Sequence, residues 1–311
     1  MGKVVVVGGT HGNELTGVYL AKKYGWLIAN PKAAELSKRY VDEDLNRCFA
    51  MSKLSDSHTK QSDCGSSLRG ALAANQSKDG TQKSYELRRA QEINEILGVK
   101  GSANSPDLIL DIHNTTANMG ITLILSARDE FLLKIAAIIA SEFTGIHIYL
   151  QPEERAESPY LGTIAKRDIC IEAGSQVHGT LNAKLFLEVE AVVLRILELA
   201  NTDFLACQTL QHCTGGSTIV ISLPVYTETC NVDYPRDENG NITAMIHPNL
   251  QGKDFCELKK AMPVFLSFDG KEILWEGEDC YPAFINEQAY YEKGIAMSLT
   301  KREILEFNLI K

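Results

Sequence analysis

The stretch Val4-Val5-Val6-Val7-Gly8-Gly9-Thr10-His11-Gly12-Asn13-Glu14 holds an apolar run that stops at glycines and leads to His11 and Glu14. A short run of β-branched residues bounded by glycine predicts a strand that is buried on both faces, as in a parallel sheet. Histidine and glutamate are both metal ligands, and residues three apart on a starting helical turn lie on one face. The stretch therefore predicts a buried strand that leads into half of a metal site.

A second fragment, Leu108-Ile109-Leu110-Asp111-Ile112-His113-Asn114, repeats the arrangement of a buried strand followed by histidine. Asp111 and His113 are two apart on this strand, so both point to the same side, and the Asp111 carboxylate can fix the tautomer of the imidazole. Two histidines and one glutamate leave a fourth position for water, as in catalytic zinc sites. The sequence thus predicts a zinc hydrolase with one Zn²⁺ per subunit, bound by His11, Glu14 and His113.

Glu172 is the candidate general base. It follows Ile169-Cys170-Ile171, at the mouth of a predicted buried strand, where desolvation tends to raise a carboxyl pKa. A strand-end acid that faces solvent is the competing interpretation from the residues alone. Arg39 and Arg47, next to Asn46, are the best candidates for a pocket that binds a carboxylate. The remaining histidines have no comparable surroundings and are predicted to lie outside the site: His147, His178, His212 and His247.

Composition limits the other classes of function. The formal net charge of −9 and the lack of a long basic run argue against nucleic acid as a partner. No apolar stretch is long enough to span a membrane, and the N-terminus opens directly into a strand, so we expect a cytoplasmic protein without a membrane partner. The eight cysteines include no CxxC pair, which favours free thiols. The group Cys207, His212 and Cys213 matches no common zinc finger and is interpreted as a surface segment.

Strand-like and helix-like patterns alternate through the first two thirds of the chain, which favours a parallel sheet in a domain over residues 1–205. A β-rich domain over 206–311 follows, and the polar segment 52–84 is interpreted as a mobile insertion whose His58 and Cys64 are excluded from the site. Strands are predicted over 3–7, 26–29, 107–112, 121–125, 146–150, 168–172, 217–223 and 263–268, and helices over 14–24, 85–97, 131–143 and 181–199.

Three segments together resemble the aspartoacylase family: Gly8 to Gly17, Arg39-Tyr40 with Asp44-Leu45-Asn46-Arg47, and Asp111 to Thr116. Blocks further along the chain fit as well, among them Asp233 to Gly240 and Asn286 to Glu292. The resemblance implies a zinc-carboxypeptidase-like α/β fold: a mixed, mainly parallel sheet flanked by helices, with a smaller β-rich C-terminal domain that closes over the site.

The resemblance also implies roles for single residues. His11, Glu14 and His113 would bind zinc, while Glu172 would activate water and then protonate the leaving amine. Arg39 would polarise the amide carbonyl and stabilise the oxyanion. A substrate carboxylate would be held by Asn46, Arg47 and Tyr290. From its sequence context alone, Tyr290 is more typical of packing or interface surface.

The chain departs from the family pattern where the side-chain carboxylate of aspartate would bind. Ser158 and Gly162 stand at the positions of the family tyrosine and arginine, and the nearby Tyr160 and Arg167 are candidate substitutes. Gly294 stands at the position of a family lysine, with Lys293 beside it. The segment 52–84 is also longer than usual for the family, and the link between Tyr24 and Trp26 is shorter, without any change in the metal set.

The expected activity is zinc-dependent hydrolysis of the amide of an N-acyl amino acid, in the first place an N-acyl-L-aspartate that gives aspartate and a carboxylate. Three alternatives stay open: a deacylase of another N-acyl amino acid, a zinc carboxypeptidase and a non-catalytic metal-binding protein. The expected partner is a small anionic substrate, and formation of a homo-oligomer is left open.

Overall fold

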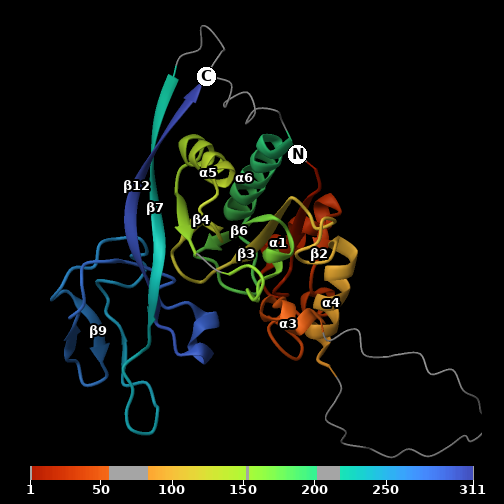
Figure 1. The fold of residues 1–311 in the computed structure, drawn as a ribbon. Coiled ribbons are helices and arrows are strands. Elements are labelled where there is room, and N and C mark those ends of the chain that lie inside the picture. The colour runs from red at the N-terminus through yellow and green to blue at the C-terminus, as the bar shows by residue number, and fades with distance from the viewer. Residues whose placement is uncertain (1, 56–82, 152–153, 202–217, 311) are drawn as a thin grey trace, which may run out of the picture.

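The computed structural model describes residues 2–55, 83–151, 154–201 and 218–310, and its centre is one large twisted sheet (Figure 1). Nine strands lie in the order β11-β12-β7-β5-β4-β6-β3-β1-β2. Five of the eight neighbouring pairs are parallel, and the pairs β4/β6, β7/β12 and β11/β12 are antiparallel. The predicted α/β fold with a mixed, mainly parallel sheet is confirmed.

The central strands β1 (Val4–Gly8) and β3 (Leu108–Asn114) explain why this sheet has two unlike faces. On β3, Leu108, Leu110 and Ile112 point to one face and join the main hydrophobic core. The alternate residues point to the other face, where Ile109 joins a second core, and Asp111 and His113 continue the same row. The sheet therefore buries a purely apolar face on one side and presents chemical groups on the other.

Helices cover both faces. The main core packs against α1 (Leu15–Tyr24), α5 (Glu130–Glu142) and α6 (Ala183–Asn201), while α4 (Tyr85–Leu97) packs on the second core. Side-chain caps fix where these helices begin: the Asn182 carboxamide accepts from the backbone N–H groups of Lys184 and Leu185 at the start of α6. Short elements complete this part of the chain: β2 (Leu27–Ile28), α2 (Pro31–Glu35), η1 (Leu45–Arg47), α3 (Met51–Leu54), β4 (Gly120–Leu125), β5 (Ile146–Leu150), η3 (Leu161–Ile164) and β6 (Arg167–Gly174).

The C-terminal region is β-rich, as predicted, but it also extends the large sheet. The strands β7 (Thr218–Val232) and β12 (Met297–Ile310) form a long antiparallel ribbon beside β5, with β11 (Tyr281–Ala283) at its edge (Figure 1). A separate three-stranded sheet holds β8 (Ala244–Ile246), β9 (Pro263–Ser267) and β10 (Glu272–Leu274), and η4 (Gln288–Lys293) follows β11. In Figure 1 this small sheet and α4 lie on opposite sides of the molecule.

Most predicted elements are present within one to three residues of their predicted bounds, and the main difference is β7. The prediction ended this strand at Leu223, before a proline, whereas it continues to Val232 because β12 pairs with it along its whole length. The boundary at 205/206, the residues His58, Cys64, Cys207, His212 and Cys213, and most of the segment 52–84 lie outside the described residues. The five described cysteines are free. Among the described helices, none is both long and apolar enough to cross a bilayer.

The predicted apolar stripe of α6 gives a test of the main core. Ile196 is fully buried, whereas Leu187 on the same helix is 60% exposed. We expect Ile196→Ala to lower the free energy of unfolding by about 2–5 kcal/mol, because it leaves a cavity. Leu187→Ala should change it by less than about 0.5 kcal/mol. Urea unfolding measures both, and equal losses would contradict the assigned faces of the helix.

Candidate metal centre and active site

The loop between β1 and α1 carries His11 and Glu14. A side chain at Gly8 would collide with α1, because its Cβ would lie 2.1 Å from the Gly17 carbonyl oxygen, and Gly9 has a φ of +68° that side chains disfavour. The chain then turns, and the Glu14 N–H donates to the His11 carbonyl oxygen at 3.2 Å. Glu14 precedes α1 with non-helical backbone angles, so the predicted helix start is wrong by one residue. A turn, and not a helix face, brings the two side chains together.

His113 and Asp111 lie side by side on β3, as their spacing predicts. His113 Nε2 is 2.9 Å from Asp111 Oδ2. The other oxygen, Asp111 Oδ1, accepts a hydrogen bond of 2.8 Å from the Thr10 hydroxyl. Both residues are 2% exposed, so this carboxylate is held from two sides and turns His113 Nδ1 toward Glu14.

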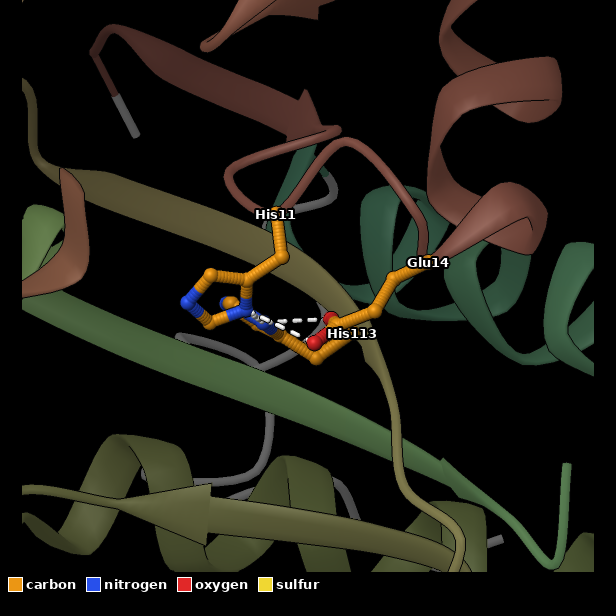
Figure 2. Close-up of side chains that lie close together, drawn as sticks. All are labelled: His11, Glu14 and His113. Carbon is orange, nitrogen blue, oxygen red and sulfur yellow. Dashed lines mark hydrogen bonds and ion pairs between the residues drawn. The ribbon is translucent and has the colours of Figure 1, made fainter. Parts of the chain in front are cut away.

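Figure 2 shows the side chains of His11, Glu14 and His113 pointing toward one another from the β1–α1 loop and β3. The Glu14 carboxylate lies between the two rings, with Oε1 2.7 Å from His11 Nδ1 and Oε2 2.9 Å from His113 Nδ1. Burial alone would raise the pKa of Glu14, but the charges of His11 and His113 overcome it and hold the pKa well below its usual value. The glutamate is therefore an anion between two imidazoles.

This donor set fits a metal ion. His11 Nδ1 and His113 Nδ1 face each other at 3.2 Å, and one atom from each of the three residues lies within 4.8 Å of the others. Each ring turns its other nitrogen outward to a carboxylate, which is the usual second partner of a metal-binding histidine. Two imidazoles and one carboxylate suit Zn²⁺. Among the described residues, this is the only such cluster.

Asp44 is the outward partner of His11, and sequence reasoning did not assign it this role. Asp44 Oδ1 lies 2.9 Å from His11 Nε2, and Oδ2 accepts from Arg39 Nη2 at 3.3 Å. Burial opposes ionisation, but the neighbouring His11 and Arg39 hold the pKa of Asp44 well below its usual range. The residue stands in a segment that the family pattern marks, yet nothing local in the sequence pairs it with a histidine 33 positions away.

Glu172 lies next to the cluster, because β6 pairs with β3 so that Glu172 stands directly beside His113. Its Oε2 atom is buried without a hydrogen-bond partner. Burial raises the pKa of Glu172 to about 8, aided by the charges of Glu14 and Glu287 and opposed by His113 and Arg39. The predicted strand-end carboxylate thus faces the cluster and not bulk solvent, with a proton affinity suited to acid–base chemistry near neutral pH.

The short helix η1 and the residues before it bring cations to the same place. Arg39 Nη1 donates to Glu14 Oε1 at 3.0 Å, so its guanidinium lies against the metal cluster. The Asn46 side chain accepts from the Leu161 N–H at 2.9 Å and so fixes the start of η3. Arg47 is held by the Asn46 carbonyl oxygen at 2.8 Å, with its guanidinium 4.8 Å from the centre of the Tyr160 ring.

The C-terminal region supplies Tyr290 and Lys293 from η4. Lys293 Nζ lies 5.2 Å from the centre of the Tyr290 ring and 3.9 Å from Asp44 Oδ2. This atom is buried and has no hydrogen-bond partner in the described structure. Burial and the nearby Arg47 lower the pKa of Lys293 to about 8, so the ammonium is charged at neutral pH and unsatisfied. Burial and the charge of Glu172 raise the pKa of Tyr290 well above its usual value, so its hydroxyl stays protonated.

Glu287 connects this region to the loop after β3. Its Oε2 accepts from the Thr115 hydroxyl, from the Thr116 hydroxyl at 2.9 Å, and from the backbone N–H groups of Thr116 and Ala117 at 2.7 and 3.2 Å. Glu287 is 3% exposed. Four donors on one buried carboxylate oxygen fix η4 relative to the loop that follows His113.

All predicted site residues line one cavity of about 150 Å³: His11, Glu14, Arg39, Asn46, Arg47, Asp111, His113, Glu172 and Tyr290. Lys293 and Tyr160 line it as well. Of the two candidate substitutes for the family residues, Arg167 is wrong: its Nε pairs with Asp129 at 2.8 Å on the α5 side of the sheet. Gly162 lines the cavity, but it has no room for a side chain, because a Cβ there would lie 2.8 Å from Asp168. Ser158 is buried, and its carbonyl oxygen accepts a hydrogen bond from the Lys100 ammonium. Gly294 ends η4 with a φ of +66°.

The other described histidines are not part of the cluster. His147 stacks on Phe255 at 4.4 Å, and His247 Nε2 lies 3.3 Å from Glu272. His178 lies nearer: its Nε2 is 3.2 Å from the Asn114 carbonyl oxygen and its Nδ1 is 2.9 Å from Gln288. It therefore bridges the segment after β6 to η4.

The assigned ligands give a test by metal binding. We expect His113→Ala to weaken Zn²⁺ binding by more than about 100-fold, since loss of an outer partner alone costs 10–100-fold. His147→Ala is the matched control, because His147 lies in the same cross-strand row through Thr122 and Glu172 but outside the cluster. Titration against a competing chelator measures both affinities, and equal values for the two variants would contradict the ligand set.

Comparisons with known proteins agree with this fold. Residues 1–200 match the family model described as the succinylglutamate desuccinylase/aspartoacylase catalytic domain, and residues 222–302 match the AstE/AspA barrel-sandwich hybrid domain. A probable aspartoacylase of Trichodesmium erythraeum is 40% identical, with 97% of each chain covered. An N-acyl-aromatic-L-amino acid amidohydrolase of Danio rerio is 39% identical, with 97% of this chain and 89% of that protein covered.

Among solved structures, murine aminoacylase 3 superposes with a TM-score of 0.83 at 32% identity, covering 99% of this chain and 98% of the other. The matches extend over nearly the whole chain and include both the metal cluster and the C-terminal region that completes the cavity. The chain belongs to the succinylglutamate desuccinylase/aspartoacylase family.

Proposed function

We propose that the protein is a zinc-dependent hydrolase that cleaves the amide bond of a small N-acyl-L-amino acid. One observation carries the proposal: Glu172, a carboxylate of raised pKa with a buried Oε2, stands beside a cluster of two histidines and a glutamate, with the Arg39 guanidinium on the cluster. A base, a metal site and a cation around one cavity are the parts that metal-assisted amide hydrolysis needs. The names of two relatives support it: one is an N-acyl-aromatic-L-amino acid amidohydrolase and the other an aminoacylase.

The metal would be held by His11 Nδ1, His113 Nδ1 and the Glu14 carboxylate. Bound there, Zn²⁺ supplies a Lewis acid that polarises a carbonyl oxygen and lowers the pKa of water to about 7. Asp44 and Asp111 hold the two rings by their outward nitrogens, at 2.9 Å each. The hydrogen bond to Asp44 favours the tautomer of His11 in which Nδ1 is free to bind a metal, and the negative charge of Asp111 beside His113 Nε2 favours the same tautomer there.

Glu172 would act as general base and then as general acid. It accepts a proton from water as the water oxygen adds to the amide carbon, and it delivers this proton to the nitrogen as the carbon–nitrogen bond breaks. The products are a carboxylate and a free amino acid. The Arg39 guanidinium is placed for the negative charge that develops on the carbonyl oxygen, and among the described residues its buried Nε has no hydrogen-bond partner.

The substrate's α-carboxylate would bind between Arg47, Lys293 and Tyr290, with Asn46 fixing the wall behind them. The ammonium of Lys293 is buried and unsatisfied, which is costly unless an anion completes it. Because η4 of the C-terminal region closes this side of the cavity, a small substrate fits better than a peptide, which disfavours a carboxypeptidase. A cytoplasmic location and a homo-oligomer remain predictions of the sequence.

The amino acid itself is the narrower part of the proposal. An aspartate derivative is the substrate expected from the sequence, but its second carboxylate would have to share Lys293 with the α-carboxylate. The rival is a substrate with a larger side chain, which the apolar lining residues Ile124 and Phe284 favour. Identities of 40% to a probable aspartoacylase and 39% to an enzyme for aromatic substrates do not separate the two.

Glu172→Gln tests the assigned base. We expect kcat for N-acetyl-amino acid hydrolysis to fall by at least about 100-fold, since a positioned general base contributes 10²–10⁴-fold, while zinc affinity stays within about threefold. Glu188→Gln on α6, an exposed glutamate, should leave both values unchanged. Steady-state kinetics with metal-loaded protein measure kcat for both variants. Undiminished turnover of Glu172→Gln with zinc retained would contradict the general-base assignment.

The titration of Lys293 predicts a pH dependence of KM, which two variants at this position separate from the effects of other groups. Its pKa of about 8 means that the ammonium is charged below this pH and neutral above it. We therefore expect the KM for N-acetyl-L-aspartate to rise about tenfold between pH 7 and pH 9.5, as a charge-assisted hydrogen bond is lost. Lys293→Arg keeps its charge and should remove the rise, and Lys293→Met should have a high KM throughout. Three identical pH profiles would contradict the role of Lys293.

A further inference from the structure

The cavity extends well beyond the metal cluster, along the face of the sheet. In the strand order β3, β6, β4, β5, β7, its lining residues are His113, Glu172, Ile124, Tyr149 and Glu228. Neighbouring strands are about 4.8 Å apart, so Glu228 lies roughly 14 Å from the strand of Glu172. This is more length than an acetyl group and a short side chain need.

The register of the strands keeps this row on one face. Cys170 pairs with Ile124, Ile124 with Tyr149, and Tyr149 with Tyr226. Residues two apart on a strand point to the same side, so Glu228 on β7 shares the face of Glu172 on β6. The far end of the cavity is therefore a continuation of the same polar row that carries the metal ligands.

The far end holds a carboxylate without a cation. Four other lining acids have partners. Glu14 and Asp111 contact the histidines of the cluster, Asp168 pairs with Arg155 at 2.6 Å, and Glu287 accepts hydrogen bonds from the loop after β3. Glu228 has no lysine or arginine partner within salt-bridge distance in the described part of the chain. Burial, and after it the charge of the nearby Glu228, raise the pKa of the Tyr149 hydroxyl well above its usual value.

The lining cations all lie at the other end. Arg39 and Lys293 both approach Asp44, and Arg47 is close enough to Lys293 to disfavour its charge. No arginine or lysine of the described residues lines the cavity near Glu228, where Asn231 and Ser298 add only neutral polar groups. A second substrate carboxylate placed there would be repelled by Glu228 and would find no cation among the described lining residues.

The direction of the substrate follows from the proposed chemistry, on which this inference rests. The amide carbonyl belongs at the metal cluster and Arg39, and the nitrogen belongs at Glu172, which protonates it. The amino-acid part therefore lies beyond Glu172, and its α-carboxylate turns to Arg47 and Lys293. Its side chain is left to run over Ile124 toward Tyr149 and Glu228.

We propose that the β5–β7 end of the cavity is a side-chain subsite in which Glu228 selects N-acyl-L-amino acids with a long side chain that ends in a positively charged hydrogen-bond donor. The Tyr149 hydroxyl and the Ser298 side chain border the same position and help to orient the donor. Glu228 is thus a specificity-determining residue, and a second carboxylate is disfavoured there.

A matched pair of substrates tests this subsite. Nα-acetyl-L-lysine and N-acetyl-L-norleucine have the same side-chain length and differ by the terminal ammonium. For the metal-loaded wild-type protein, we expect kcat/KM to favour the lysine derivative by about tenfold, as one charge-assisted contact is gained. Glu228→Gln should reduce this ratio to about two, chiefly by lowering kcat/KM for the lysine derivative. Glu306→Gln, an exposed glutamate on β12, is the control and should keep the wild-type ratio.

A second variant distinguishes a change in specificity from a loss of folded structure. Glu228→Lys should reverse the preference, so that N-acetyl-L-glutamate is hydrolysed better than Nα-acetyl-L-lysine, while the norleucine derivative still reports an intact catalytic centre. A wild-type protein that prefers N-acetyl-L-aspartate or N-acetyl-L-norleucine, with ratios unaffected by Glu228→Gln, would overturn the subsite alone. Absence of turnover with every N-acetyl amino acid would overturn the proposed function and the subsite with it.

Discussion

Strand β3 is buried on both faces, and the alternation of its side chains imposes the layout of the molecule. Leu108, Leu110 and Ile112 must face apolar helices, so Asp111 and His113 must face the other way. The close contact of Gly8 with Gly17 then sets the β1–α1 turn beside them, which brings Glu14 between two imidazoles. A buried anion is stable there only because both rings, and Arg39, are directed at it.

The C-terminal region makes this half-site into a closed cavity. β7 and β12 extend the large sheet, and the hydrogen bonds that Glu287 accepts from Thr116 hold η4 against the loop after β3. Lys293 and Tyr290 thereby reach the same space as Arg47, from the far end of the sequence. Excluding water from such a cavity penalises the charged form of each buried group, which is the main cause of the raised pKa of Glu172 and the lowered pKa of Lys293.

The sequence predicts the parts that depend on local pattern. The candidate ligands His11 and His113 follow from histidines near strand ends, and α6 follows from its stripe of apolar residues. Partners distant in sequence are not predicted: Asp44 shows no local sign that it bonds His11. Arg167 was wrong for a reason that strand parity explains, because it is five residues from Glu172 and so faces the opposite side of β6. The proposed role of Glu228 has no sign in the sequence, because Pro224 favours an end to the strand and only the pairing with β12 shows that β7 continues.

The account centres on one metal ion beside Glu172, and anomalous diffraction at the zinc edge tests it most directly. Crystals grown with Zn²⁺ should show one peak in this cavity, about 2.0–2.2 Å from His11 Nδ1, His113 Nδ1 and a Glu14 oxygen, with Asp44 and Asp111 on the outward nitrogens. A peak bound by other residues, or no peak among these three in crystals that hold zinc elsewhere, would contradict the account.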